Sequence, residues 1–168
     1  MLINKKLTNK KKQGFTLIEL LVAVAISLIL MSSIIGTFLN YLDKRKVSNS
    51  VDELKTFFQR AQAEASSGDL GGCDQLSGYR VMTYQVGEIT ELSLQATCSI
   101  GTADAAETYE FARRVNISPT IDYNFNVLHA GVDLTGGAAS EAINVSNETN
   151  SFTFTIYREG RFSEGDWQ

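Results

Sequence analysis

Hydrophobic and polar positions divide the chain into three stretches with different periodicities. From Phe15 to Leu39 the chain is apolar, and Glu19 is its only formal charge. Residues 47–65 follow the spacing of one helix face, with apolar residues at alternating steps of four and three: Val47, Val51, Leu54, Phe58, Ala61 and Ala65. Beyond residue 72, apolar and polar residues alternate in short runs, which is typical of β-strands.

The first two stretches predict one continuous helix, because no proline interrupts residues 15–66. The sequence "SSGDLGG" (66–72) ends it, with Gly68 expected directly after the last helical residue. The amphipathic half has too few heptads for a coiled-coil seam, so we expect its apolar stripe to pack on a sheet.

The apolar run is long enough to cross a membrane. At 1.5 Å per residue, its twenty-five residues span about 37 Å, more than the hydrocarbon core of a bilayer. A secretory signal peptide fits poorly, because the run is too long and no cleavage site of small residues follows it. The sequence therefore predicts a membrane helix.

Charge is distributed unevenly along the chain. Residues 1–14 hold five lysines and no acid, whereas the rest holds ten basic and nineteen acidic residues. The positive-inside bias predicts a cytoplasmic amino terminus and a carboxy-terminal domain on the far side of the membrane. The acidic remainder has no general electrostatic attraction to nucleic acid or to anionic lipid, and nucleic acid is not an expected partner.

The third stretch predicts a domain rich in strands. Residues 79–86 and 89–98 are expected to form a hairpin with its tip at Gly87-Glu88. Further strands are predicted at 108–115, 121–127 and 152–156, and a short last strand after a turn at Glu159-Gly160, whereas 129–151 is expected to be mostly loop. The predicted fold class is α+β, with the long helix packed on a mostly antiparallel sheet of five or six strands.

Two cysteines, Cys73 and Cys98, lie in the part predicted to be outside the cytoplasm, where disulfides persist. The hairpin would bring Cys73, just before its first arm, close to Cys98, at the end of its second. We expect a disulfide between them; the alternative is two unrelated buried thiols.

Glu19 is the residue that this pattern leaves unexplained, because a carboxylate inside an apolar helix is costly unless it has a function. Its surroundings, "KKKQGFTLIELLVAV", resemble the amino terminus of the type IV pilin superfamily, which includes the pseudopilins of type II secretion. The resemblance covers residues 10–36: a basic leader, the Gly14-Phe15 junction, Glu19 five residues after the leader, and an apolar helix.

The resemblance implies that a prepilin peptidase cuts between Gly14 and Phe15 on the cytoplasmic side and that the new amine of Phe15 is methylated. It implies four parts: a leader (1–14), a transmembrane and filament-core helix (15–39), its amphipathic continuation (40–67) and an extracytoplasmic domain (68–168). Glu19 would pair with the Phe15 amine of a neighbouring subunit in a filament. The expected partners are the peptidase, other pilin or pseudopilin subunits, the inner-membrane assembly platform and, before assembly, membrane lipid.

The chain departs from many pilins at Gly36, where they carry a proline at the corresponding mature position. Glycine also weakens a helix. Two interpretations stay open: a bend or local melting over residues 32–36, or a close approach of neighbouring helices at Gly36.

The order of elements also resembles, more loosely, the H-type pseudopilin and FimT-like minor pilin group. The residues that carry this likeness are "LKTFFQRAQAEASS" (54–67) and "IYREGRF" (156–162). It favours a structural subunit, a minor pilin or pseudopilin. The alternative is a binding module that the filament displays for DNA, a surface or an exported substrate. Acidic residues beside Arg158 and Arg161, and Glu107 and Glu110 before Arg113-Arg114, argue against DNA, although a local patch could still form in three dimensions.

Nothing in the sequence predicts an enzyme. His129 is the only histidine and has no partner suggested by spacing, and no metal-ligand set or phosphate-binding loop is present. We expect no catalytic residue, no metal and no cofactor. For Trp167, near the carboxy terminus, an exposed contact and a cover for the sheet edge are both compatible with the sequence, and we favour the cover.

Overall fold

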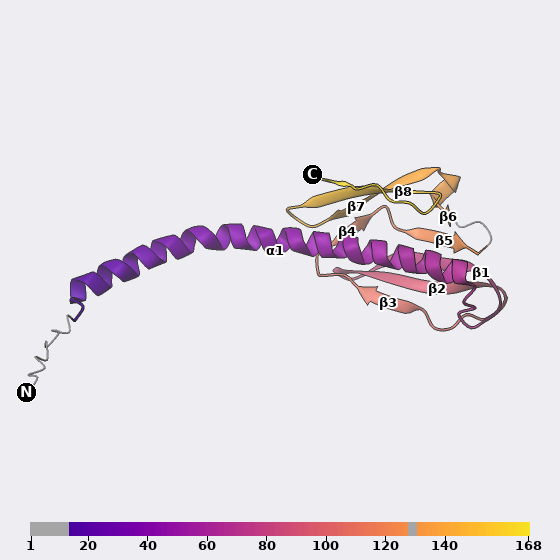
Figure 1. The fold of residues 1–168 in the computed structure, drawn as a ribbon, viewed down its shortest axis with the longest axis horizontal. Coiled ribbons are helices and arrows are strands. Elements are labelled where there is room, and N and C mark those ends of the chain that lie inside the picture. The colour runs from indigo at the N-terminus through magenta and orange to yellow at the C-terminus, as the bar shows by residue number, and fades with distance from the viewer. Residues whose placement is uncertain (1–13, 128–130) are drawn as a thin grey trace, which may run out of the picture. The chain divides into compact units, whose positions relative to one another are not determined.

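The computed structural model describes residues 14–127 and 131–168 (Figure 1). The predicted leader, apart from Gly14, and His129 lie outside these residues. The chain divides into two compact units, Met1–Leu39 and Asn40–Gln168. The helix α1 (Leu17–Ser67) contributes its apolar part to the first unit and its amphipathic part to the second.

The predicted continuous helix is confirmed, since α1 is 51 residues long and unbroken through Gly36. Its carboxy-terminal end is also where the sequence places it. Gly68 follows Ser67 with φ of 73°, the left-handed conformation that stops a helix and that glycine adopts without strain.

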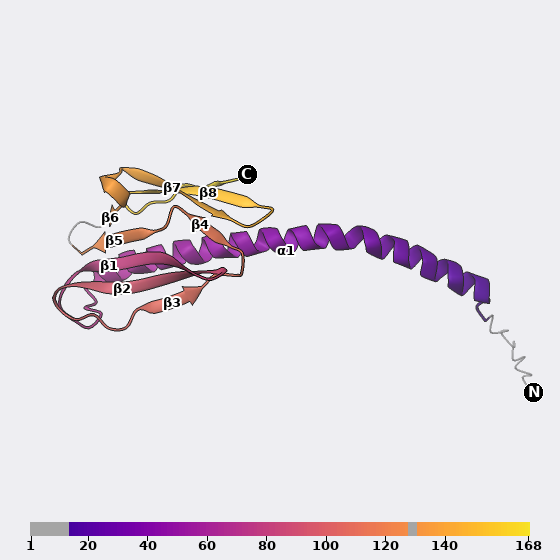
Figure 2. The ribbon, with the colours of Figure 1, turned by 180° about the vertical axis from the view of Figure 1, so that it is seen from behind.

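The second unit contains two antiparallel sheets, seen from opposite sides in Figures 1 and 2. The five-stranded sheet has the order β3-β2-β1-β5-β6, with strands β1 (Cys73–Val86), β2 (Ile89–Gly101), β3 (Glu107–Glu110), β5 (Asp122–Asn126) and β6 (Val132–Asp133). The four-stranded sheet has the order β4-β7-β8-β9, with strands β4 (Asn116–Ser118), β7 (Ser140–Ser146), β8 (Ser151–Tyr157) and β9 (Asp166–Trp167). The predicted α+β class is confirmed. The sequence predicted a single sheet of five or six strands, whereas the second unit contains the two sheets described here.

The hairpin of β1 and β2 turns where the sequence predicts it. Val86 pairs with Ile89, and Gly87 has φ of 65°, as a two-residue hairpin loop requires. Both arms run further than expected, back to Cys73 and Gly101. Cys73 and Cys98 form a disulfide there, with their Cα atoms 5.4 Å apart.

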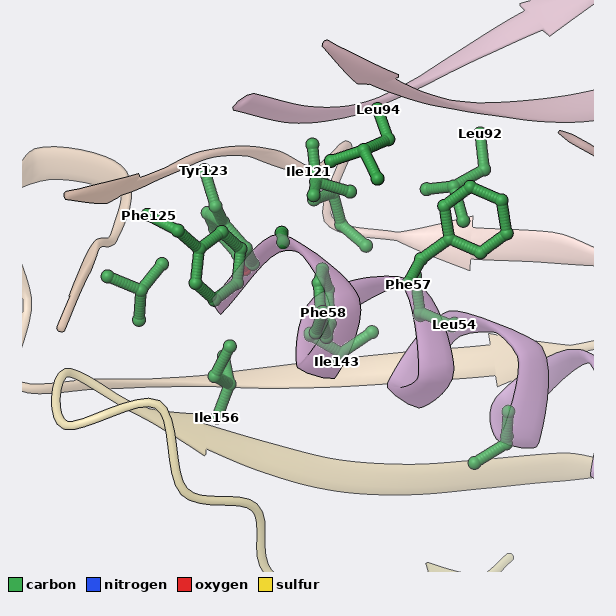
Figure 3. Packing of buried hydrophobic residues seen from close by; sticks show 14 of the residues in the cluster. Leu54, Phe57, Phe58, Leu92, Leu94, Ile121, Tyr123, Phe125, Ile143 and Ile156 are labelled. Atoms are coloured by element: carbon green, nitrogen blue, oxygen red, sulfur yellow. The ribbon is translucent and has the colours of Figure 1, made fainter. Parts of the chain in front are cut away.

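The amphipathic part of α1 packs against residues of both sheets. All six positions of the predicted stripe are buried, none being more than 4% exposed. Phe58 is central: its ring centroid lies 5.8 Å from that of Tyr123 and 5.9 Å from that of Phe125. Figure 3 shows it between these β5 residues and Ile143 of β7. The stripe thus serves sheet packing, as predicted, and not a coiled coil.

The strand predicted at 108–115 is only partly present, because β3 ends at Glu110. Phe111 and Val115 are both buried, but Val115 N donates to Ala112 O in a turn, and Arg114 has φ of 65°. Apolar residues four apart fit such a turn as well as a strand, so the alternation was misleading here.

The prediction that 129–151 is mostly loop was wrong. Of its described residues, β6, a short 3-10 turn (Thr135–Gly137) and β7 occupy much of the segment. In β7, Ile143 pairs with Phe154 and Val145 with Phe152 across the sheet. The glycine, serine and asparagine residues around Ile143 and Val145 are typical of loops, so the composition does not indicate the short strand that tertiary packing stabilises there.

The carboxy-terminal segment covers one edge of the four-stranded sheet. The turn predicted at Glu159-Gly160 is present, with φ of 79° at Gly160, but Phe162 makes only a single bridge to Ile156. The last strand is β9, where Trp167 packs edge-on against Phe152 at 5.1 Å between ring centroids. Trp167 lies at the sheet edge, as the favoured interpretation has it, and 39% of its side chain stays exposed.

A tyrosine hydroxyl is buried between the sheets. Tyr123 is fully buried, and neither its Oη nor Oε2 of Glu141 has a hydrogen-bond partner among the described residues. Burial raises the pKa of the Tyr123 hydroxyl, and the negative charge of Glu141 adds to the rise.

This burial predicts alkaline instability. Above pH ~10 the unfolded chain ionises Tyr123 while the folded chain holds its proton, so the free energy of unfolding falls by about 1.4 kcal/mol per pH unit. Tyr123→Phe should remove that part of the decline and leave stability at pH 7 unchanged or higher, as an unsatisfied hydroxyl is lost. Denaturant unfolding at pH 7 and at pH 11 measures both; an unchanged pH dependence in the variant would contradict the assignment.

Candidate functional site

The amino-terminal end of α1 is closed by a reciprocal pair of side chains. Thr16 is the residue before the helix, and its Oγ1 accepts a hydrogen bond from the backbone N–H of Glu19 at 3.3 Å. In return, the backbone N–H of Thr16 donates to Oε2 of Glu19 at 3.4 Å. This is a capping box, which satisfies two backbone donors that the helix leaves unpaired.

Sequence reasoning identified Glu19 but missed Thr16. The signal was available, because "TLIE" (16–19) has the Thr-x-x-Glu spacing of a capping box directly before an apolar run. In this structure Glu19 is therefore not a bare charge at the edge of an apolar helix. Its carboxylate is already directed toward the backbone at the start of α1.

The Gly14–Phe15 peptide bond lies just before this cap. Both residues are non-helical and exposed, and 84% of the Phe15 surface is accessible. Apart from its chain neighbours, no atom of the described residues lies within 4 Å of the place where a side chain on Gly14 would begin. The bond is therefore accessible, because it lies in a short exposed segment before α1 begins.

The apolar run presents a long exposed apolar surface. Residues 14–32 and 35–39 are exposed throughout, including fifteen large hydrophobic side chains from Phe15 to Leu39. Two hydroxyls within the run are satisfied by its own backbone, because Ser27 donates to Ala23 O and Ser32 donates to Ile29 O, both at 2.8 Å. Among the described residues, α1 is the one helix long and apolar enough to cross a membrane.

Gly36 lies within this exposed run. It is helical, and apart from the adjoining backbone of α1 no atom of the described residues is within 4 Å of the position that a Cβ would occupy. This side of α1 is open to a second helix, and a glycine lets the two backbones approach closely.

The described part of the second unit contains no comparable chemical site. Cys73 and Cys98 are joined and leave no free thiol. Within residues 14–127 and 131–168, no group of three or more histidine, cysteine or acidic side chains is placed to hold a metal ion.

Comparison with known proteins identifies a family motif in the amino-terminal stretch of the chain. Residues 9–35 match the family described as the prokaryotic N-terminal methylation motif. No curated protein and no solved structure matches the chain. The matched residues include the accessible Gly14–Phe15 bond, the Thr16–Glu19 cap and most of the exposed apolar run. The motif is the signature of type IV pilins and pseudopilins, and its presence at residues 9–35 supports a type IV pilin-like precursor.

Proposed function

We propose that this protein is a structural subunit of a filament, a minor pilin or pseudopilin, cut between Gly14 and Phe15 by prepilin peptidase. The observation that carries the proposal is the apolar surface of residues 15–39 behind a capped, charged start. Such a surface needs a cover of lipid or of other helices. A subunit of this kind is first embedded in the membrane, where lipid covers the apolar surface. Once it joins the filament, the helices of neighbouring subunits cover that surface instead.

Glu19 is the assembly residue in this proposal. Cleavage creates an ammonium group on Phe15, which is methylated in this class of protein. An unpaired ammonium or carboxylate inside an apolar bundle is strongly unfavourable, whereas a pair between neighbouring subunits removes both penalties and fixes their axial stagger. The capping box supports this role, because it holds the Glu19 carboxylate at the start of α1, four residues from the new amine.

The proposed organisation follows from the same argument. Residues 1–14 are a removable leader on the cytoplasmic side, residues 15–39 cross the membrane and later form the filament core, and residues 40–67 continue the helix into the domain of residues 68–168. That domain lies outside the cytoplasm, in the periplasm or at the cell surface. The partners are prepilin peptidase, other subunits and the assembly platform of the inner membrane.

Three arginines of the second unit, Arg60, Arg80 and Arg161, are engaged by neighbouring side chains and do not favour nucleic-acid binding. Arg80 is bound in a bidentate pair with Asp122 at 2.6 and 2.7 Å, and Arg60 contacts Glu64 and Glu107. Arg161 lies over the ring of Tyr157, at 4.5 Å. Nucleic-acid binding needs a patch in which positive charge exceeds its surroundings, and these side chains do not form one.

Intact mass and amino-terminal sequencing test the proposal. The chain is recovered from the native membrane or filament fraction without reduction. We expect a first residue of Phe15, one added methyl group, and a mass lower by two protons for the Cys73–Cys98 bond. A chain that still begins at Met1, in cells with an active prepilin peptidase, would refute prepilin processing.

A further inference from the structure

Five basic residues belong to the part of the second unit where α1 begins its amphipathic part, three of them consecutive on α1 and two in the turn after β3. Lys46 of α1 and Arg113 and Arg114 of the turn after β3 line a cavity of about 90 Å³. Lys44 and Arg45 precede Lys46 on α1 and are exposed. We call Lys44, Arg45, Lys46, Arg113 and Arg114 the basic face. They are half of the basic residues that follow the leader.

The basic face is only partly neutralised. Its cavity also holds Asp43, which pairs with Lys46 at 2.8 Å, and Glu148, which lies 3.3 Å from Arg114. The Arg114–Glu148 pair is two-thirds exposed on each side, so it is weak and exchangeable. Among the described residues, Arg45 and Arg113 take part in no ion pair. An anion that enters the cavity therefore meets the guanidinium group of Arg113, which takes part in no ion pair among the described residues, and that of Arg114, which is loosely held.

Trp167 lies beside this face. It is the only tryptophan of the chain, and Nζ of Lys44 is 4.4 Å from its ring centroid. One edge of the indole packs on Phe152, while 39% of the side chain is exposed. Tyr41, three residues before Lys44 on α1, is 57% exposed. Tryptophan and tyrosine next to basic side chains are characteristic of the boundary between hydrocarbon and lipid headgroups.

The helix places these residues at the matching depth. The apolar run ends at Leu39, and Lys44 follows five residues later on α1, a rise of about 7.5 Å. The headgroup layer on each side of a bilayer is about 5–8 Å thick. If residues 15–39 fill the hydrocarbon core, Lys44 lies at the outer limit of the headgroup layer. Arg45 and Lys46, at rises of about 9 and 10.5 Å, lie just beyond it, and their long side chains can reach back to the lipid phosphates.

We propose that the basic face binds the phosphate groups of anionic phospholipids in the leaflet that α1 leaves, with Trp167 at the interface beside them. The proposal rests on the membrane-spanning role proposed above for residues 15–39. It adds a specific lipid contact for the second unit of the unassembled subunit. That contact must be released when the subunit leaves the membrane, so the lipid competes with the filament for the subunit.

The test uses the emission of Trp167 in the mature full-length chain, reconstituted into vesicles. One set contains bromine-labelled phosphatidylglycerol in a phosphatidylcholine bilayer, and the other contains the same fraction of bromine-labelled phosphatidylcholine. We expect quenching by the anionic label to be about twofold stronger, because bound lipid is enriched next to Trp167, and we expect this excess to fall at high salt. Equal quenching in the two sets would overturn the proposal.

Two variants with a matched control locate the contact. Arg113→Gln combined with Arg114→Asn should abolish the excess, and asparagine suits the left-handed backbone at Arg114. Arg45→Gln, at an exposed helical position, should reduce it even if the first variant fails to fold. Arg158→Gln with Arg161→Gln removes as much charge elsewhere and should change nothing; an excess retained by both basic-face variants would refute the site. Failure of the wild-type chain to float with vesicles of either composition would instead refute the membrane helix.

Discussion

Replacing Glu19 by alanine is expected to reduce incorporation into filaments to background, while cleavage after Gly14 continues. The expected loss is larger than tenfold, because the variant leaves the Phe15 amine of a neighbouring subunit buried without a counter-charge. Glu19→Gln should lose assembly almost as fully, since an amide keeps the shape of the side chain but not its charge. The measurement is the amount of subunit in purified filaments relative to the amount in membranes.

Thr16 separates this charge pairing from the local cap. Thr16→Ala breaks the capping box and should destabilise the first turn of α1 by about 1 kcal/mol, but it keeps the Glu19 carboxylate. We expect it to reduce assembly only modestly, and Thr16→Ser should restore the wild-type level. If Thr16→Ala were as defective as Glu19→Ala, the cap and not the ion pair would be the function of Glu19.

Replacing Phe58 by alanine is expected to lower the free energy of unfolding by about 3–5 kcal/mol. Phe58 is fully buried, and its ring contacts Tyr123, Phe125 and Phe162 at centroid distances of 5.8 to 5.9 Å. Tyr123 and Phe125 belong to β5, and Phe162 belongs to the segment after β8. Removal of the ring therefore leaves a cavity lined by two separate parts of the domain.

Denaturant unfolding of the mature chain in detergent measures this effect, with the emission of Trp167 as the probe. Phe58→Leu keeps most of the buried volume and should cost about 1 kcal/mol. Val86→Ala, at a side chain 52% exposed, serves as the control and should be near neutral. A loss below 1 kcal/mol for Phe58→Ala would show that the helix does not depend on this contact.

The helical half of the fold could be predicted because two independent signals agree there. The apolar periodicity from Val47 to Ala65 marks the buried face, and the absence of proline from residues 15–66 allows one continuous element. The helix end at Gly68 and the hairpin turn at Gly87 could also be predicted, because both residues adopt backbone conformations that favour glycine. In each case a short-range rule decides the structure.

The missed elements depend on long-range packing. Strand β7 exists because Ile143 and Val145 meet Phe154 and Phe152 of β8, and a polar composition around them gives no local sign of that pairing. The division into two sheets is likewise set by α1, which covers both. Sequence periodicity cannot tell one sheet from two when every strand has one apolar face.

At the amino terminus, the sequence identified the important charged residue but not the hydrogen bonds that it makes. Glu19 is conspicuous because an acid in an apolar run violates the hydrophobic pattern, whereas Thr16 is an ordinary polar residue and passes unnoticed. The basic face was not foreseen either. Arg113 and Arg114 lie sixty-seven residues beyond Lys46 in the chain, and only the turn after β3 brings them to one cavity.

The disulfide has a consequence for the timing of folding. It joins Cys73 and Cys98, 25 residues apart, at the end of the hairpin where register shifts interrupt the pairing of β1 with β2. A cross-link over that separation stabilises a domain by about 3–4 kcal/mol in the chain-entropy model, and it forms only under oxidising conditions. On the topology proposed above, a newly made chain among cytosolic thiols holds the second unit in a weaker form, which is easier to unfold for export or to degrade. Oxidation after translocation then makes the more stable form the one that persists outside the cytoplasm.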